Sequence, residues 1–525
     1  MKKKLFLFTA ALWASFTLSA ADLYVNPVTG NDANNGSLST PLKTIETAVL
    51  TKLQSNVQTT IHIADNSVIT LTAILNFNTD KKVLLTGKNV VLKAAALPAQ
   101  KDPSGLPVTG EGNRILRATT NCDLKIVGIT FQNGRQVGYI LGGAIFFAGN
   151  TLEVDSCKFI DNQAGSAGGA IGARGGSVIV KNSYFQGNNI LGGGARGAAI
   201  MQCGPATGTP GTLLVQNCTF YQNMTQVGGS GMVINIYDST LSSVGGAYTN
   251  MGKVEVNNCT FIENTSPTTN QAVIDVSDGD CDVYLVNNTF YKNSDCAFRL
   301  MLSHAYLANN VIVAGKQGIM SEAKVADGRP EMIAINNIVV GTEGGINGSI
   351  DDACFTTAAS SNNNIVSTTA AYPLANVGLA TSLSTDRFVP YLPIISGSSA
   401  LINAGTDDTS AKFGSNYVLN YDITHLGKNS TRDIGAFEYG GIHDGLSFQK
   451  YISDDFSISQ SGDILKVKSN TEKSFTLNLV DLSGKVVYSS KATSIMNINK
   501  KSFEQGVYIL MLNNGAQVSS KKVLF

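Results

Sequence analysis

The sequence predicts an all-β chain that folds as a right-handed parallel β-helix, a solenoid of about nine to eleven coils, followed by a small antiparallel β-sandwich. A phrase of eleven residues returns six times between residues 124 and 293. The chain contains 53 glycines in 525 residues, and charged residues make up only 14%. This glycine-rich, charge-poor composition is typical of a tightly turned, β-rich extracellular protein.

The first 21 residues have the pattern of a secretory signal peptide. Lys2, Lys3 and Lys4 precede an apolar stretch that runs to about Leu18, and small residues follow before Asp22. A membrane anchor is the alternative, but about 14 apolar residues are fewer than the ~20 that a helical span requires. We therefore expect a signal peptide over residues 1–21 and no transmembrane segment in the mature chain.

A short helical cap is expected next. Residues 44–54 follow Pro41 and place Ile45, Ala48 and Val49 at helical spacing. Because a solenoid must cover the open ends of its core, this segment is a plausible cap at the N-terminal end of the coils.

The repeated phrase joins two short strands. Apolar residues alternate within it, as in Val254, Val256, Cys259 and Phe261, and one or two asparagines interrupt the alternation. Period-2 alternation predicts strands with one inward face, and asparagine tolerates the left-handed backbone of a sharp bend. We expect equivalent asparagines to stack as a ladder: Asn258, Asn287, Asn309 and Asn336.

A third strand, led by glycine, follows each phrase, as in GGAIFF (142–147) and GGAIGA (168–173). The phenylalanine of the phrase recurs at steps of 26 to 41 residues. The shortest steps exclude a propeller blade of ~40–45 residues, and no helix-forming stretch separates the strands as in leucine-rich repeats. Three strands per coil define a parallel β-helix, and its recurring phenylalanines are Phe131, Phe159, Phe185, Phe220, Phe261 and Phe290.

Three of the eight cysteines, Cys157, Cys218 and Cys259, share one position of the phrase. Stacked in the interior they would act as small hydrophobic residues, so we expect free thiols there. Cys281 and Cys296 are close enough in sequence to form a disulfide, and only this proximity supports one.

The charge of the body disfavours nucleic acid as a partner. The whole chain has 38 basic and 38 acidic residues. Three lysines lie in the signal segment, and residues 445–525 carry ten lysines and six acids, which leaves 25 basic against 32 acidic groups, a net charge of −7. A nucleic-acid binder needs a basic footprint instead.

Two segments resemble secreted right-handed parallel β-helix proteins of the pectate-lyase-like superfamily. One is the opening DLYVNPVTGNDANNGSLSTPLKTIETAV (22–49), and the other is RDIGAFEY (432–439). The resemblance implies a β-helix over residues 22–440 and a polysaccharide-binding or polysaccharide-degrading function. The GGAI and FxxN pairs are also similar to the repeats of polymorphic outer-membrane adhesins.

The C-terminal residues are similar to the sorting domain of the type IX secretion system of the Bacteroidota. The motifs are DLSGKVVY (481–488) and FEQGVYILMLNNG (503–515), whose alternating residues suit a small antiparallel sandwich. This resemblance assigns residues 441–450 to a linker and 451–525 to the sorting domain. It implies partners in the type IX machinery and outer-membrane glycolipid, and a secreted location at the outer-membrane surface or in the extracellular space.

The glycine-led strands predict a row of outward side chains, one per coil: Phe146, Gly172, Met201, Asn235, Asp275, Arg299 and Met320. Consecutive coils lie about 4.8 Å apart, so polar groups in this row would follow a sugar chain. We expect Asn235, Phe146 and His304, near the groove edge, to bind substrate. Asp275 and Arg299 are the catalytic candidates, with a simple ion pair on a solvated face as the alternative.

The chemistry of this row favours a lyase over a hydrolase. A lyase that abstracts the proton beside a uronate carboxylate needs a base and a cation, and Arg299 could serve as the base or as a carboxylate clamp. A hydrolase needs two carboxylates, and the row holds one. The run DVSDGDCD (275–282) also places Asp275, Asp278, Asp280 and Asp282 in one turn, where they could bind Ca²⁺ or form an acidic solvent loop.

Two functions follow from these observations. The first is a secreted or cell-surface protein that binds extracellular polysaccharide, with its degradation left open. The alternative is a non-catalytic surface adhesin or structural protein. Fold-level resemblance does not decide between them.

Overall fold

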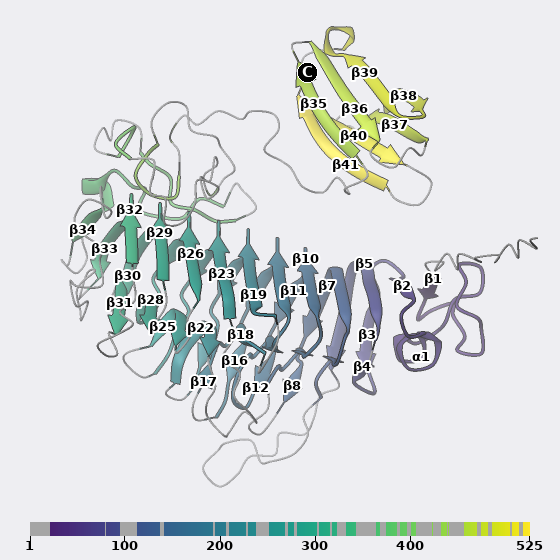
Figure 1. Ribbon diagram of the computed structural model, residues 1–525, viewed down its shortest axis with the longest axis horizontal. Helices are drawn as coiled ribbons and strands as arrows, with labels where there is room; N and C mark the ends of the chain where they lie inside the picture. The colour runs from purple at the N-terminus through teal and green to yellow at the C-terminus, as the bar shows by residue number, and fades with distance from the viewer. Residues whose placement is uncertain are drawn as a thin grey trace, which may run out of the picture. The chain divides into compact units, whose positions relative to one another are not determined.

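Figure 1 shows a computed structural model of the chain. The residues that the structure describes are 21–78, 80–94, 113–136, 141–192, 195–205, 209–226, 229–237, 251–267, 271–277, 281–301, 304–315, 318–322, 332–342, 364–367, 374–385, 389–395, 401–405, 423, 432–437, 439, 456–461, 463–469, 474–480, 486–503, 507–513 and 518–524. The predicted signal peptide lies outside them, except for Ala21. None of the helices in these ranges is long and apolar enough to cross a membrane.

The chain divides into two units. Unit 1 contains Met1–Val418 and Arg432–Phe437, and unit 2 contains Leu419–Thr431 and Glu438–Phe525. In unit 1 the described strands pair in parallel with the strands of the neighbouring repeats. Figure 1 shows these strands side by side in chain order, with the purple N-terminal strands at one end and the green ones at the other.

The repeated phrases form the largest parallel sheet, which has 20 strands among the described residues. Its strands are β1 (Ala21–Val25), β2 (Gln58–Ile63), β3 (Val68–Leu71), β5 (Lys82–Ala94), β7 (Asp123–Gln132), β10 (Thr151–Asp155), β11 (Lys158–Ile160), β14 (Ser177–Lys181), β15 (Tyr184–Gln186), β19 (Gly211–Gln216), β20 (Thr219–Tyr221), β23 (Met251–Asn257), β24 (Thr260–Ile262), β26 (Asp282–Val286), β27 (Thr289–Tyr291), β29 (His304–Ala308), β30 (Val311–Gly315), β32 (Met332–Ile335), β33 (Ile338–Thr342) and β34 (Ile365–Ser367).

The glycine-led strands form a second parallel sheet. A third sheet has strands of two residues, which follow strands of the first sheet along the chain. The second sheet contains β4 (Leu75–Phe77), β6 (Leu116–Ala118), β9 (Ile145–Phe147), β13 (Ile171–Arg174), β17 (Ala195–Arg196), β18 (Ile200–Cys203), β22 (Gly229–Tyr237), β25 (Ala272–Ser277), β28 (Cys296–Met301) and β31 (Ile319–Glu322). The third contains β8 (Arg135–Gln136), β12 (Gln163–Ala164), β16 (Asn189–Ile190) and β21 (Met224–Thr225).

The phenylalanines of the phrase stack in the core of unit 1. Phe159 and Phe185 are fully buried, with ring centroids 4.7 Å apart, and the rings of Phe220 and Phe261 are also 4.7 Å apart. Each phenylalanine occupies the same position in its strand, because Phe159 pairs with Phe185 and Phe220 pairs with Phe261 on adjacent strands. Each ring therefore buries its faces against the rings of the neighbouring repeats.

The asparagines of the predicted ladder make the bend of each phrase, and a second, inward-facing ladder lies one residue further along. Asn258, Asn287, Asn309 and Asn336 have φ between 54° and 56°, so they make the left-handed bend of each phrase. The residues after them point inward and bond in series. The amide Nδ2 of Asn288 donates to Oδ1 of Asn310 at 3.0 Å, and that of Asn310 donates to Asn337 at 2.9 Å. A second inner ladder contains Asn162, Asn188, Asn223, Asn264 and Asn293.

The cysteines at this bend are buried free thiols, as predicted for Cys157, Cys218 and Cys259. Burial raises the pKa of the Cys157 thiol to about 12, so it stays protonated at neutral pH and is a poor nucleophile. Cys281 and Cys296 are also buried, and no disulfide joins them.

The N-terminal cap forms where the sequence predicts it, as the single turn α1 (Ile45–Thr47) and the π-helical segment η1 (Ala48–Lys52). The Thr44 hydroxyl accepts a hydrogen bond from the Thr47 N–H. Asp32 fixes the entry to this turn, because its carboxylate accepts from the N–H groups of Lys43 and Thr44 at 3.0 and 2.8 Å.

The segment around RDIGAFEY contacts the last repeats. The N–H of Gly435 donates to the Asn336 carbonyl at 2.9 Å, and the Asp433 carboxylate accepts from the N–H of Asn403. Nearby lies the 3₁₀ turn η4 (Leu374–Val377). These contacts tie the end of unit 1 to its final strands.

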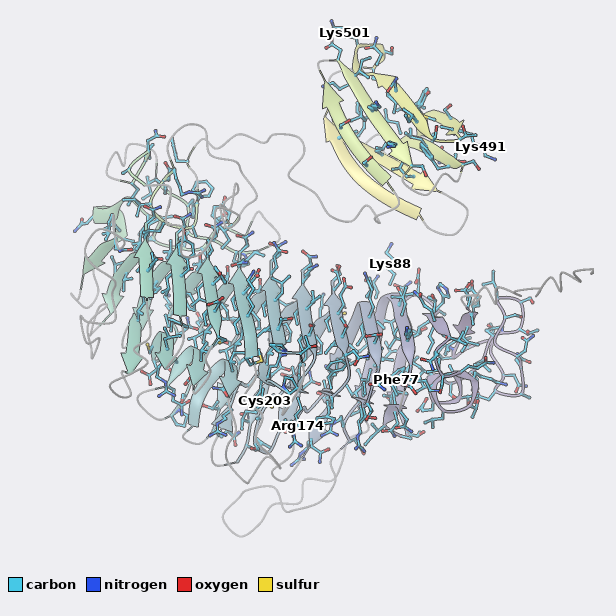
Figure 2. The ribbon with its side chains drawn as sticks, in the orientation of Figure 1. Phe77, Lys88, Arg174, Cys203, Lys491 and Lys501 are labelled. Carbon is cyan, nitrogen blue, oxygen red and sulfur yellow. The ribbon has the colours of Figure 1, made fainter. Side chains whose placement is uncertain are left out.

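Unit 2 has two antiparallel sheets and its own core. Its leucines at alternating positions, such as Leu477, Leu479 and Leu510, are fully buried. Figure 2 labels Lys491 and Lys501 on this unit. Its elements are β35 (Phe456–Ser461), β36 (Ile464–Ser469) and β39 (Ile495–Asn499) in one sheet, β37 (Phe475–Val480), β38 (Val486–Ala492), β40 (Val507–Asn513) and β41 (Val518–Leu524) in the other, and the 3₁₀ turn η5 (Lys500–Ser502).

Candidate functional site

The predicted row of side chains exists in the second sheet with the register that the sequence indicates. Asn235 pairs with Asp275, Asp275 with Arg299, and Arg299 with Met320. Towards the N-terminus the row passes through Met201, Gly172 and Phe146 and then continues to Arg117 and Asn76. We call this line of equivalent positions the outer row.

Glycine turns bring the chain onto the strands of this sheet. Gly142, Gly168 and Gly197 have φ of 77°, 63° and 61°. A Cβ atom on Gly168 would lie 2.4 Å from the carbonyl oxygen of Ile171, so a side chain there would collide with backbone. Glycine is required because the turn folds the chain back sharply before each strand.

This turn places a second layer of chain over part of the outer row. The residues just before the glycines, Leu141, Ala167 and Arg196, form parallel bridges with one another. Leu141 and Ala167 pack with Met201 and Cys203 in a small apolar cluster separate from the main core. We call this layer the cover.

The cover leaves no room at two positions of the row. An added Cβ on Gly172 would lie 2.7 Å from Cβ of Leu141, and one on Gly231 would lie 2.6 Å from Cβ of Asn235. The middle of the outer row therefore lies beneath neighbouring chain.

The candidate catalytic residues are buried, which corrects the expectation of an open, solvated face. Asn235 and Asp275 are 0% exposed and Arg299 is 8% exposed. Nη2 of Arg299 donates to Oδ2 of Asp275 in an ion pair, and the side-chain amide of Asn235 donates to the Asp275 carbonyl at 3.5 Å. The alternation of apolar residues in the strands predicts the register of these side chains but not their exposure.

A second buried carboxylate, which the sequence analysis missed, lies at the start of β28. Asp295 accepts from the N–H groups of Gln271 and Cys296 at 2.9 and 3.0 Å. Burial raises the pKa of the adjacent Cys296 thiol. The Cys296 N–H also donates to the Gln271 carbonyl, so Asp295 adds to the backbone pairing between two repeats and its role in these contacts is structural.

The N-terminal end of the outer row is more accessible. Arg117 is exposed and Phe146 is partly exposed. The guanidinium carbon of Arg114 lies 5.1 Å from the centroid of the Phe146 ring, and that of Arg174 lies 5.9 Å from it. Figure 2 labels Arg174 and Cys203, which pair on adjacent strands. We call Phe146, Arg114, Arg117 and Arg174 the arginine corner.

The three arginines of this corner are functional candidates that the sequence reasoning missed. One signal could have found them. Five of the nine arginines of the chain lie between residues 114 and 196, while the body as a whole is net acidic. Uneven use of arginine over lysine marks places where a planar, multidentate donor is needed.

Of the remaining predicted residues, the structure describes His304 and Asp282. His304 begins β29 and pairs with Asp282, which is exposed. Asp278 and Asp280 lie outside the described residues. Within the described ranges, no three His, Cys, Asp or Glu side chains are grouped so that they could hold a metal ion. Calcium binding by residues 275–282 stays a prediction.

Comparison with known proteins identifies the C-terminal unit. Residues 461–525 match the model of the secretion system C-terminal sorting domain. This match indicates a Bacteroidota-type protein that the type IX system exports to the cell surface or the extracellular space. No curated protein matches the chain in sequence.

One solved structure gives a weak likeness, the crystal structure of the GH136 lacto-N-biosidase from Eubacterium ramulus as its selenomethionine derivative. It is 11% identical, with 59% of this chain and 67% of that chain covered and a TM-score of 0.27. At this TM-score the likeness supports no inference about the activity of this chain.

Proposed function

We propose that the chain is a right-handed parallel β-helix that type IX secretion delivers to the bacterial surface, where it binds extracellular polysaccharide. The proposal divides the chain into a signal peptide (1–21), the β-helix (22–440), a linker (441–450) and the sorting domain (451–525). Parallel strands joined by crossover connections support the right-handed sense. Attachment to outer-membrane glycolipid after export belongs to the same proposal.

The observation that carries polysaccharide binding is the outer row. Its N-terminal end presents Asn76, Arg117 and Phe146 on adjacent strands at the spacing of about 4.8 Å, so an extended polymer can meet three equivalent positions at once. Its accessible end carries an aromatic ring and guanidinium groups, which supply apolar contact and hydrogen-bond donors together.

Binding without cleavage is the function that this geometry supports best. A general base must come within hydrogen-bond reach of the proton that it removes. Asp275 and Arg299 form an ion pair and are almost completely buried, so substrate would reach them only after neighbouring chain moved. This favours the adhesin reading over a lyase and leaves the pair as the residues to mutate if cleavage occurs.

The test uses the purified full chain on a panel of neutral and uronic polysaccharides, with Ca²⁺ and with chelator. We expect retention on at least one polysaccharide and neither new reducing ends nor unsaturated uronate absorbance. Unsaturated product lost in Arg299→Lys would establish a lyase. Failure of the folded chain to bind any member of a broad panel would contradict the proposal and favour a purely structural role.

A further inference from the structure

The two units of the chain differ in the charge that their residues carry. Residues 22–444 contain 25 basic and 32 acidic groups, a net charge of −7. The seven strands of unit 2 contain five lysines and no acidic residue. The strands of unit 2 therefore contribute only positive charge.

Two of these lysines lie on the central strand of the three-stranded sheet. Lys466 and Lys468 on β36 are exposed, and they alternate with Leu465 and Val467, which are buried in the core of unit 2. β36 pairs with β35 on one side and with β39 on the other. The two lysines therefore point away from the core, about 7 Å apart along the strand.

The side chains across from these lysines are uncharged. Lys466 pairs with Ser459 on β35 and with Asn497 on β39, and Lys468 also lies between two uncharged residues. We call the exposed residues of this sheet the lysine face: Ser457, Ser459, Ile464, Lys466, Lys468, Ile495, Asn497 and Asn499.

Two lysines at other exposed positions have acidic partners. In unit 1, Lys125 pairs with Glu153 on the adjacent strand, with Nζ and Oε1 3.1 Å apart. In unit 2, Nζ of Lys501 lies 2.7 Å from a carboxylate oxygen of Asp463. The two lysines of the lysine face form no ion pair in the part of the chain that the structure describes. An opposite charge across the strands would stabilise the sheet, and this face does not use one.

Protection of a sheet edge does not explain these lysines. Lysine on an edge strand keeps the sheets of different molecules from pairing, but β36 is the central strand of its sheet. Lysine is also depleted in strands, where side chains that pack on a pleated surface are preferred. The lysine face therefore offers two positive charges to a partner outside the chain.

We propose that the sorting domain docks through the lysine face on an acidic surface of a protein of the type IX export machinery. β36 and β39 lie within residues 461–525, which match the sorting-domain model. Carboxylates of the partner pair with Lys466 and Lys468. The exposed Ile495 and Asn497 add apolar and hydrogen-bonding contacts beside them, the mixture that protein interfaces use. The inference rests on export by the type IX system and does not depend on polysaccharide binding.

A protein fits this face better than an anionic membrane does. Recognition of a charged membrane surface takes clusters of about four to eight cations, whereas β36 supplies two. A folded partner can place its carboxylates to meet two cations about 7 Å apart, and such complementarity sets the specificity of docking.

The experiment measures export of the full chain, with its signal peptide, from a Bacteroidota host that has the type IX system. Immunoblots with an antibody against unit 1 measure the chain in the cell envelope, at the surface and in the medium. Glutamine keeps the polarity of the side chain and removes its charge. The double variant Lys466→Gln, Lys468→Gln should therefore be exported about 10-fold more slowly, because it loses two charged contacts.

A charge series and a matched control locate the effect. Lys466→Arg, Lys468→Arg keeps both charges and should be exported within about 2-fold of the native rate, whereas Lys466→Glu, Lys468→Glu should be exported more slowly than the Gln variant. The control is Lys88→Gln, Lys158→Gln, which removes two exposed lysines from unit 1 and should keep the native rate; Figure 2 labels Lys88. Thermal denaturation of each purified chain checks its folding, which surface substitutions change little.

The outcomes separate the inference from the export route. Native export of the folded Gln variant, equal loss in the Gln and Arg variants, or equal loss in the unit 1 control overturns the inference and leaves type IX export standing. Undiminished export of the native chain from a host without the type IX system overturns both.

A second measurement tests the membrane as the partner. The purified full chain is mixed with vesicles of phosphatidylglycerol and phosphatidylcholine in equal parts, and sedimentation measures the bound share. We expect the native chain and the Gln variant to bind equally weakly. Binding by the native chain that the Gln variant loses would assign the lysine face to a membrane and overturn the protein partner.

Discussion

The charged side chains at the two ends of the outer row differ in burial and in pairing. Near the C-terminal repeats Arg299 lies beneath neighbouring chain and meets Asp275, so its charge is neutralised by the protein itself. Near the N-terminal repeats Arg117 is exposed beside Phe146, on strands without acids. Equivalent positions of one repeat can therefore lie buried in an ion pair or remain accessible, and what differs is the packing around them.

We expect the largest effect on stability from removing one partner of the buried ion pair between Asp275 and Arg299. Replacing Arg299 by Met leaves the Asp275 carboxylate buried without its cation, and we expect unfolding of unit 1 to become easier by about 3–5 kcal/mol. Urea denaturation of the full chain, followed by circular dichroism, measures the change. The double variant Asp275→Leu, Arg299→Met removes both charges and should recover most of the loss.

The result that contradicts this prediction is a small effect. If Arg299→Met costs less than about 1 kcal/mol, which is the range of an exposed ion pair, the pair is solvated and the original expectation of an open site is right. In that case substrate can reach Asp275 and Arg299, and cleavage assays on variants of these two residues become the decisive measurement.

The cover is the next feature to test, because the glycine turns create it. Gly168→Ala places Cβ 2.4 Å from a backbone oxygen at φ of 63°, and we expect a cost of about 3 kcal/mol. Gly187 is a matched control with φ of 64°, whose added Cβ would meet only the side-chain Oδ1 of Asp161. Its Ala variant should cost about 1 kcal/mol.

A second observation indicates that Gly187→Ala costs little stability. Other repeats place non-glycine residues with positive φ at the position of Gly187, namely Asp161, Gln222, Glu263 and Lys292. Denaturation midpoints of the two variants, measured side by side, should differ clearly. Equal midpoints would mean that the turn before each strand tolerates side chains and that the cover does not depend on glycine.

The sequence predicts the repeats well and the site poorly, for a physical reason. The alternation around Phe261 and the glycines before Ile171 are local patterns, and they place every outer-row residue in its correct register. Burial of Asp275 depends on how the surrounding chain packs, which periodicity does not encode. The alternation also does not show that the residue after each left-handed asparagine turns inward, as Asn288, Asn310 and Asn337 do.

At the accessible end of the outer row we expect a moderate effect on binding and little effect on stability. Phe146→Leu keeps an apolar side chain but removes the ring faced by two guanidinium groups, and we expect affinity for polysaccharide to fall about 3- to 10-fold. Its denaturation midpoint should change little. If binding is unchanged while stability falls, the ring serves only to pack the arginines, and the contrast between the two ends is weaker.

We expect the smallest effect on stability at the N-terminal cap, where hydrogen bonds stabilise the charge of Asp32. Burial opposes ionisation of Asp32, but the hydrogen bonds from Thr44 and Lys43 outweigh it, so the pKa of this carboxyl is lowered from 3.8. A lowered folded-state pKa means that the ionised form stabilises the fold above pH 3.8 and that this contribution is lost as pH falls through the lower value. In thermal scans from pH 6 to pH 2, the gap in Tm between the native chain and Asp32→Asn should close at the acid end. A constant gap in Tm would show that the hydrogen-bond geometry, which the amide of the Asp32→Asn variant also provides, matters more than the charge of Asp32. Backbone N–H donors would then not replace a cation such as Arg299, which pairs with Asp275.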